Sequence, residues 1–264
     1  ACHGPVTDAA RELATVSELV HLATLLHDDV IDDGQERRGF PTSRRIWGNA
    51  VSVLAGDLLL THALERTSAV GDAASLADLF ATLRRLVDGE VVQLRGRTAV
   101  DVSEATYFQV VRGKTASLFA WAGRAGARAG GAPEALVAAH GAFGEHLGVA
   151  FQLVDDVLDY AGAAEATGKR LFADLHEGKV TLPLLRAIAA RPSLAPELSA
   201  VRQGDEAAAS RLGAAVLELG VCADVRALAH AETRLSVEAI ASVPKGPARD
   251  LLTGVAEDLV ARLG

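Results

Sequence analysis

The stretch LLHDDVIDD, residues 25–33, ends an apolar, helix-like run, and the stretch FQLVDDVLDY, residues 151–160, repeats its acidic pattern half a chain later. Residues four apart in an α-helix lie only about 40° apart around the axis, so Asp28 and Asp32 point the same way, as do Asp155 and Asp159. Like charges at this spacing destabilise a helix, and buried carboxylates need partners. The two patterns therefore predict sites for a divalent cation such as Mg²⁺, which takes oxygen ligands from carboxylates and substrate phosphates.

Composition excludes several other classes of protein. Half of the 264 residues are hydrophobic, which is enough for one large core. A net charge of −8 with only 4% aromatic residues is unfavourable for binding nucleic acid. Cys2 and Cys222 lie too far apart in sequence to suggest a metal motif or a disulfide framework, so we expect a reducing, cytoplasmic compartment. No apolar run reaches the ~18 residues of a membrane span.

The apolar periodicity is helical throughout, and strand-like alternation is absent, so the predicted fold class is all-α. Residues 33–41 are expected to be a polar loop, residues 162–179 a polar loop or a broken helix, and residues 1–264 a single domain. The chain begins Ala1-Cys2-His3 and contains no Met, so we expect an N-terminal segment to be missing. The helices are expected at residues 8–32, 42–66, 73–95, from 102 with an interruption near Gly113, at 134–160 and 181–190, and in three later segments separated by Arg191-Pro192, Gly220 and residues 244–247.

Basic residues accompany the acidic clusters. Arg37 and Arg38 follow the first cluster, Lys169 and Lys179 follow the second, and Lys114 lies between them in Gly113-Lys114-Thr115. Each lysine alone is more typical of a solvated surface, and the arginines alone could be simple salt-bridge partners. Together with metal ions they form the array that a diphosphate needs, because metals bridge its oxygens and fixed cations neutralise the remaining charge.

The joint pattern resembles the trans-isoprenyl diphosphate synthases, or polyprenyl synthetases. Four strings carry this resemblance, between about residue 21 and residue 185: LLHDDVIDDGQERRGFPT, GKT, FQLVDDVLDYAGAAEATGK and DLHEGKVTLPLL. The resemblance implies a helical bundle around a deep central cavity, with the two acidic motifs facing each other across its mouth. It also implies a homodimer that condenses isopentenyl diphosphate with an allylic diphosphate by ionisation, condensation and elimination.

The resemblance assigns roles to particular residues. Three Mg²⁺ ions would be held directly by Asp28, Asp32 and Asp155, with Asp29, Asp156 and Asp159 acting mainly through water or by orienting the ligands. Arg37, Lys114, Lys169 and Lys179 would hold the allylic diphosphate, and Thr115 and Gln152 would lie beside the reacting carbons. His21 and Arg38 would bind isopentenyl diphosphate.

Two of these points stay open. A histidine such as His21, one turn inside an apolar face, is often a hydrogen-bonded core residue instead of a ligand. The family also carries a Gly-Lys-Arg element near its N-terminus that grips isopentenyl diphosphate, and no such string precedes His21. We attribute this difference to truncation.

Product length and assembly are also predicted. Ala23 and Thr24 lie one turn before Asp28, where a bulky aromatic residue ends the cavity in short-chain members, and both are small. We therefore expect a product of about C25 or longer, unless Ser52 or Leu83 closes the end of the cavity and so forms its floor. Apolar helix faces such as residues 116–122 could pack against a partner subunit.

Three rival interpretations remain. A class I terpene cyclase shares Mg²⁺ and an acidic motif, but it usually lacks a second Asp-Asp-x-x-Asp and the string Glu177-Gly178-Lys179. A non-catalytic partner subunit of a heteromer usually loses the aspartates, which are all present in this chain. A helical scaffold with solvated acids does not account for their apolar surroundings.

Overall fold

The computed structural model describes residues 1–37, 39–98, 103–161 and 172–262. Its elements are α1 (Asp8–Ile31), β1 (Glu36–Arg37), β2 (Phe40–Pro41), α2 (Ser43–Trp47), α3 (Asn49–Val70), α4 (Ala73–Thr98), α5 (Glu104–Val110), the π-helix η1 (Val111–Ala116), α6 (Ser117–Ala129), α7 (Glu134–Ala161), α9 (Ala173–His176), α10 (Leu182–Ala190), the 3₁₀-helix η2 (Pro192–Leu194), α11 (Ala195–Arg202), α12 (Glu206–Glu218), α13 (Val221–Ala239) and α14 (Pro247–Ala261). The predicted all-α class is confirmed: among the described residues the only sheet is the antiparallel pair β1–β2, two residues per strand.

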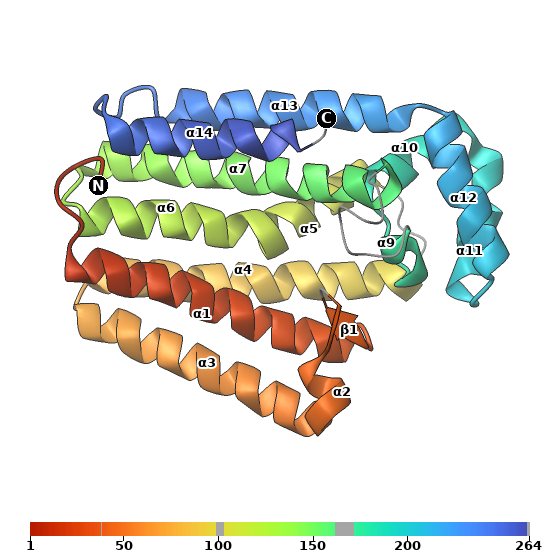
Figure 1. The fold of residues 1–264 in the computed structure, drawn as a ribbon, viewed down its shortest axis with the longest axis horizontal. Coiled ribbons are helices and arrows are strands. Elements are labelled where there is room, and N and C mark those ends of the chain that lie inside the picture. The colour runs from red at the N-terminus through yellow and green to blue at the C-terminus, as the bar shows by residue number, and fades with distance from the viewer. Residues whose placement is uncertain (38, 99–102, 162–171, 263–264) are drawn as a thin grey trace.

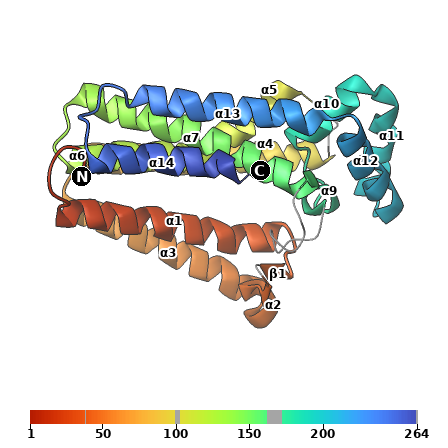
Figure 2. The same cartoon turned by 45° about the horizontal axis from the view of Figure 1, so that its top comes forward.

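The long helices lie side by side along one axis. In Figure 1, α1 and α3 form one side of the bundle, α13 and α14 form the opposite side, and α4, α6 and α7 lie between them; Figure 2 shows the same parallel arrangement from a second direction. The short helices α11 and α12 pair at one end. One buried apolar cluster joins α1, α3, α4 and α6 around the fully buried Trp121, and a larger one surrounds α7.

Helix α1 shows how the sequence sets these elements. Thr7 caps its first turn by accepting a hydrogen bond from the backbone N–H of Ala10 at 3.1 Å. Leu13, Val16 and Val20 recur at helical spacing and are buried, so one face of α1 packs into the bundle. The helix ends in the first acidic motif, as predicted.

Helices α6 and α7 pack unusually closely. A Cβ atom on Gly144 would lie 2.3 Å from the carbonyl oxygen of Phe119, and one on Gly148 would lie 2.5 Å from Cα of Ala116. These contacts would be too short for a real Cβ atom, so the two backbones can pack this closely only because glycine has none. Within residues 116–122, the side chains of Ala116, Ala120 and Trp121 are fully buried inside the monomer, whereas Leu118, Phe119 and Ala122 are half-buried, so packing of this segment against a partner subunit stays a prediction.

Three predicted helix boundaries are corrected by the structure. The helix expected over residues 42–66 is split into α2 and α3 at Gly48, whose φ of +83° favours glycine. The interruption expected near Gly113 is the π-helix η1, which joins α5 to α6 without a break. The first of the three expected C-terminal segments is split into α11 and α12 around Gly204, at φ +89°.

Helices α3 and α4 end at Val70 and Thr98, beyond the predicted residues 66 and 95, and residues 173–176 of the segment 162–179 form the short helix α9. Ser103 caps α5 by accepting from the N–H of Thr106, and α7 and α10 begin and end within a residue or so of their predicted limits. None of the described helices combines the length and the apolarity that crossing a bilayer requires.

Candidate active site

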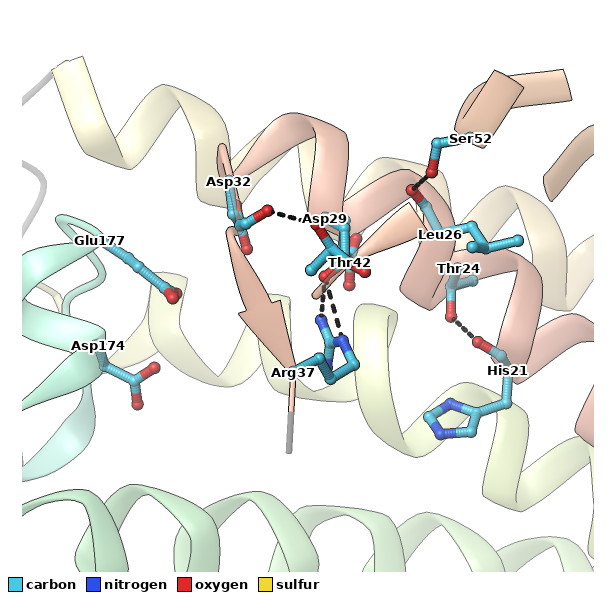
Figure 3. Close-up of polar contacts among 12 residues, drawn as sticks. His21, Thr24, Leu26, Asp29, Asp32, Arg37, Thr42, Ser52, Asp174 and Glu177 are labelled. Atoms are coloured by element: carbon cyan, nitrogen blue, oxygen red, sulfur yellow. Dashed lines mark hydrogen bonds and ion pairs between the residues drawn. The ribbon is translucent and has the colours of Figure 1, made fainter. Parts of the chain in front are cut away.

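The two acidic motifs lie at the same end of the bundle. Helices α1 and α7 run in the same direction along the molecule, and their C-terminal ends, where the motifs sit, both point toward α9 (Figure 1). Figure 3 shows Asp32 at the end of α1 facing Asp174 and Glu177, which come from the α9 region. Segments far apart in sequence therefore supply acidic side chains to one region.

Each aspartate of the first motif contacts a cation. Asp28 lies 3.4 Å from Nζ of Lys114, and Asp32 lies 3.3 Å from Nζ of Lys179. Asp29 is the buried member, with 8% of its side chain exposed, and its Oδ1 accepts hydrogen bonds from Nε and Nη2 of Arg37 at 3.1 and 2.8 Å. The salt-bridge interpretation of Arg37 is thus realised in this structure (Figure 3).

Lys179 connects the acidic end of α1 to the acidic side chains of the α9 region. Its Nζ lies 3.3 Å from Asp32, 2.5 Å from Glu177 and 3.9 Å from Asp174. Burial disfavours its charged form, but the three carboxylates around it outweigh burial and raise its pKa. Lys179 therefore remains an ammonium group that bridges the end of α1 to the α9 region.

The second motif is more deeply buried. Asp156 accepts hydrogen bonds from the hydroxyl of Tyr107 at 2.6 Å and from Nε2 of Gln152 at 2.8 Å, and the N–H of Leu182 lies 3.5 Å away. Burial raises the pKa of Asp156 to about 7, and the charge of Asp174 adds to this rise while the two side-chain hydrogen bonds oppose it. Both oxygens of Asp156 are therefore engaged by the protein.

A chain of polar contacts joins the motifs through the π-helix η1. Lys114 on η1 reaches Asp28, and the next residue, Thr115, donates to Oε1 of Gln152 at 3.0 Å. Gln152 in turn donates to Asp156. Because π-helical turns are rare and recur at functional sites, this placement of Lys114 and Thr115 favours a functional over a purely structural role for η1.

The donor set fits a hard divalent cation. Asp28, Asp32 and Asp155 are half-buried carboxylates, and lysine ammonium groups lie against Asp28 and Asp32. Burial raises the pKa of Asp28; Lys114 opposes the rise, and the carboxylate of Glu90 adds to it. Within the described residues no three His, Cys, Asp or Glu side chains converge to hold a metal unaided. Phosphate oxygens would complete such a shell, as is usual for Mg²⁺.

The other predicted residues fall into three groups. Arg38 and Lys169 lie outside the described residues. His21 is exposed on α1, which contradicts its interpretation as a core histidine, and its backbone carbonyl accepts from Thr24 Oγ1 at 2.8 Å. Asp159 is buried on α7, near the end of the second motif.

The expected cavity lining needs correction. Ala23 is fully buried, so it does not border open space, whereas Thr24 is half-buried. Ser52 is buried and donates to the carbonyl of Leu26 at 3.1 Å, so it ties α3 to α1 (Figure 3) and is not a floor. An apolar pocket of about 370 Å³ lies between α6, α7 and α14; it is lined by Phe119, Leu147, Phe151, Val255, Asp258, Leu259 and Arg262.

Three polar residues of this region were missed by sequence reasoning. Glu90 forms an ion pair with Lys114, Tyr107 donates to Asp156, and Asp174 contributes to the charge around Lys179. Asp174 belongs to the string DLHEGK and could have been selected from it. Glu90 and Tyr107 carry no local signal, because only the packing of α4 and α5 brings them to the motifs.

The arrangement defines a class of protein. An all-helical bundle with acidic helix ends gathered at one end is the isoprenoid synthase fold, and solved structures with that fold superpose closely on this chain. A polyprenyl synthase from Caulobacter crescentus, solved with calcium and isoprenyl diphosphate, aligns with a TM-score of 0.93 and 38% identity, covering 100% of this chain and 81% of that one.

Sequence comparison agrees with the fold. The polyprenyl synthetase family pattern matches residues 1–219. An octaprenyl diphosphate synthase from Haemophilus influenzae is 38% identical over 92% of this chain and 75% of its own length. A probable mitochondrial hexaprenyl pyrophosphate synthase from Neurospora crassa is 40% identical over 97% of this chain, which spans 59% of that relative. The chain belongs to the polyprenyl synthetase family.

Proposed function

We propose that this protein is a Mg²⁺-dependent prenyltransferase that condenses isopentenyl diphosphate with an allylic diphosphate into a medium-chain or long-chain product. One observation carries the proposal: the acidic motifs on α1 and α7 lie at one end of the bundle and are linked through Lys114, Thr115 and Gln152. The Caulobacter relative, solved with calcium and isoprenyl diphosphate, supports a shared cation and diphosphate site.

The residues of the site suit the proposed steps. Lys114 and Lys179 supply fixed positive charge where a diphosphate leaving group would depart, which favours breaking its C–O bond. Bound Mg²⁺ would neutralise further charge on that leaving group. Thr115 and Gln152 offer oxygens beside the nascent allylic cation. No dedicated base is evident among the residues that the structure describes, so we assign proton removal to the released diphosphate.

Product analysis tests this function. The purified protein is incubated with labelled isopentenyl diphosphate and allylic starters of increasing length, and products are sized after dephosphorylation. We expect Mg²⁺-dependent chain extension to about C25 or longer. A product that stops at C15 would refute the chain-length part, and conversion of an allylic diphosphate without isopentenyl diphosphate would favour a terpene cyclase.

A homodimer in the cytoplasm completes the proposal. Helices α3 and α4 expose apolar side chains at helical spacing, a surface that favours association: Val51, Leu54, Leu58, Phe80 and Val87. Light scattering should give twice the mass of the chain, and a monomer at micromolar concentration would contradict the homodimer. Cys2 and Cys222 are both free thiols, as a reducing compartment favours. Cell fractionation tests this location.

A further inference from the structure

Lys114 is shared between two carboxylates that come from different helices. Its Nζ lies 3.4 Å from Oδ2 of Asp28 on α1, and it forms a shorter ion pair with Oε2 of Glu90 on α4. The side chains of Glu90 and Lys114 are 13% and 22% exposed, so water screens this pair little. Both oxygens of Glu90 are buried and neither accepts a hydrogen bond from the described residues, so among these residues the ion pair with Lys114 is the main polar contact of this carboxylate.

The backbone explains how Glu90 reaches Lys114. Helix α4 crosses η1 where each contributes a glycine: a Cβ atom on Gly89 would lie 2.8 Å from the backbone nitrogen of Lys114, and one on Gly113 would lie 2.9 Å from the carbonyl oxygen of Arg85. Glu90 and Lys114 directly follow these two glycines. The same contact is fixed by a hydrogen bond of 3.0 Å from Nη2 of Arg85 to the carbonyl of Arg112.

We propose that Glu90 is a positioning residue for the transfer reaction, which holds the Lys114 ammonium at the first acidic motif. This inference rests on the proposed function, in which Lys114 contacts the departing diphosphate. A lysine side chain is long and flexible, and Asp28 alone would leave the ammonium free to follow the diphosphate or solvent. A second buried carboxylate restricts it to the space between α1 and α4, where leaving-group charge develops.

The substitution Glu90→Gln tests the proposal because it keeps the shape of the side chain and removes its charge. We expect kcat to fall roughly 10–100-fold, as for loss of a supporting carboxylate in other sites. KM for the allylic diphosphate should change less than about threefold, since the ammonium remains present but is less well placed. Glu90→Asp keeps the charge and should recover part of the lost kcat.

The matched control is Glu232→Gln. The Glu232 side chain on α13 is also 13% exposed and also pairs with a basic side chain, His146 at 2.7 Å, but it lies outside the acidic helix ends. This variant should retain wild-type kcat. Equal loss of kcat in Glu232→Gln and Glu90→Gln would mean that removing any buried glutamate charge impairs the enzyme, and would overturn the proposal.

A double-variant cycle with Lys114→Met separates positioning from general damage. If Glu90 acts through Lys114, Glu90→Gln should have no further effect on the single-turnover rate in the Lys114→Met background. Thermal unfolding gives a second readout: Lys114→Met leaves Glu90 buried and unpaired, so the double variant should melt at a higher temperature than Lys114→Met alone.

The outcomes distinguish this proposal from the function on which it rests. Failure of the wild-type protein to extend any allylic diphosphate would refute the function, while the thermal cycle would still report whether the two side chains are coupled. If the wild-type enzyme is active, either of two results would overturn the positioning role alone. One is wild-type activity in Glu90→Gln, and the other is a loss of activity from Glu90→Gln that is the same in the wild-type and Lys114→Met backgrounds. Absence of thermal coupling would overturn it as well.

Discussion

At the scale of single residues, the aspartates of each motif differ in surroundings. Asp29 is buried and accepts hydrogen bonds from Arg37, and Asp156 is buried and accepts them from Tyr107 and Gln152. Asp28 and Asp32 are less buried and contact lysines. The spacing of the aspartates alone does not separate them, whereas the family resemblance already implied different roles. We propose that the second aspartate of each motif orients the helix end and leaves its neighbours for ligands, and the contacts of Asp29 and Asp156 support this division.

Removing the hydroxyl of Tyr107 tests this division. Tyr107→Phe leaves Asp156 without its 2.6 Å donor, so we expect a loss of about 1–3 kcal/mol in the free energy of unfolding and a fall of roughly 10-fold in kcat. Urea unfolding and steady-state kinetics measure both quantities. Tyr160→Phe is the control, because the buried Tyr160 hydroxyl shares a hydrogen bond with the hydroxyl of Thr181 at 3.1 Å. Unchanged kcat in Tyr107→Phe would contradict an orienting role for Asp156.

Thr24 is the better position for testing product length. Ala23 is fully buried, so Ala23→Phe would overpack the bundle, whereas the half-buried Thr24 can accept a larger side chain with less strain. We expect Thr24→Phe to shorten the longest product by at least one five-carbon unit. Products are sized after dephosphorylation, and an unchanged product distribution from a well-folded variant would show that the chain grows elsewhere.

At the scale of elements, close helix crossings position the site. The close packing of α7 against η1 and α6, which we call the α6–α7 seam, aligns Thr115 of η1 with Gln152, and the α4–η1 crossing brings Glu90 to Lys114. Both crossings depend on glycines that let the backbones approach closely, even though glycine is a poor helix former. Packing has outweighed local propensity at these positions.

The substitution Gly144→Ala tests the α6–α7 seam. Alanine favours a helix by about 1 kcal/mol over glycine, but its methyl group would lie 2.3 Å from the carbonyl oxygen of Phe119. We expect a net destabilisation of about 1–3 kcal/mol, measured by chemical unfolding. Gly126→Ala on α6 is the matched control, since its added Cβ would meet nothing within 4 Å and should be neutral or stabilising. Equal effects of the two substitutions on the free energy of unfolding would contradict the conclusion that α6 and α7 pack too closely at Gly144 to admit a methyl group.

An ion-pair cluster between α4 and α6 makes a pH-dependent contribution to stability. Burial alone would raise the pKa of Asp78, but hydrogen bonds and charges from Arg124 and Arg128 outweigh it and lower the pKa below the usual 3.8. A depressed carboxyl pKa stabilises the fold above the unfolded-state value, and this contribution is lost as pH falls through the folded-state value.

Asp78→Asn should therefore destabilise the protein at pH 7 and cost little at low pH. We expect a loss of roughly 1–2 kcal/mol at pH 7, allowing for partial solvent screening. The difference from wild type should shrink as pH falls below about 4. Urea unfolding across this range measures it, and a difference that stays constant down to pH 3 would contradict the linkage.

At the scale of the whole molecule, the bundle gathers residues separated by more than a hundred positions. The helical periodicity and the paired acidic motifs were readable from sequence because they are local patterns. The partnerships of Glu90 and Tyr107 were not, since they depend on how helices cross. Gly48, Gly113 and Gly204 show the same limit: a glycine can split a helix, widen it or end it, and tertiary contacts decide which.

The central claim is that the motifs on α1 and α7 form one site for divalent cations and a diphosphate. Calorimetric titration of inorganic pyrophosphate into the wild-type protein, with and without Mg²⁺, tests it most directly when repeated on Asp28→Asn and Asp155→Asn. We predict binding that requires Mg²⁺ and is lost in both variants, although the two residues lie on different helices. Retention of Mg²⁺-dependent binding in either variant would contradict the claim, because it would separate the two motifs into independent sites.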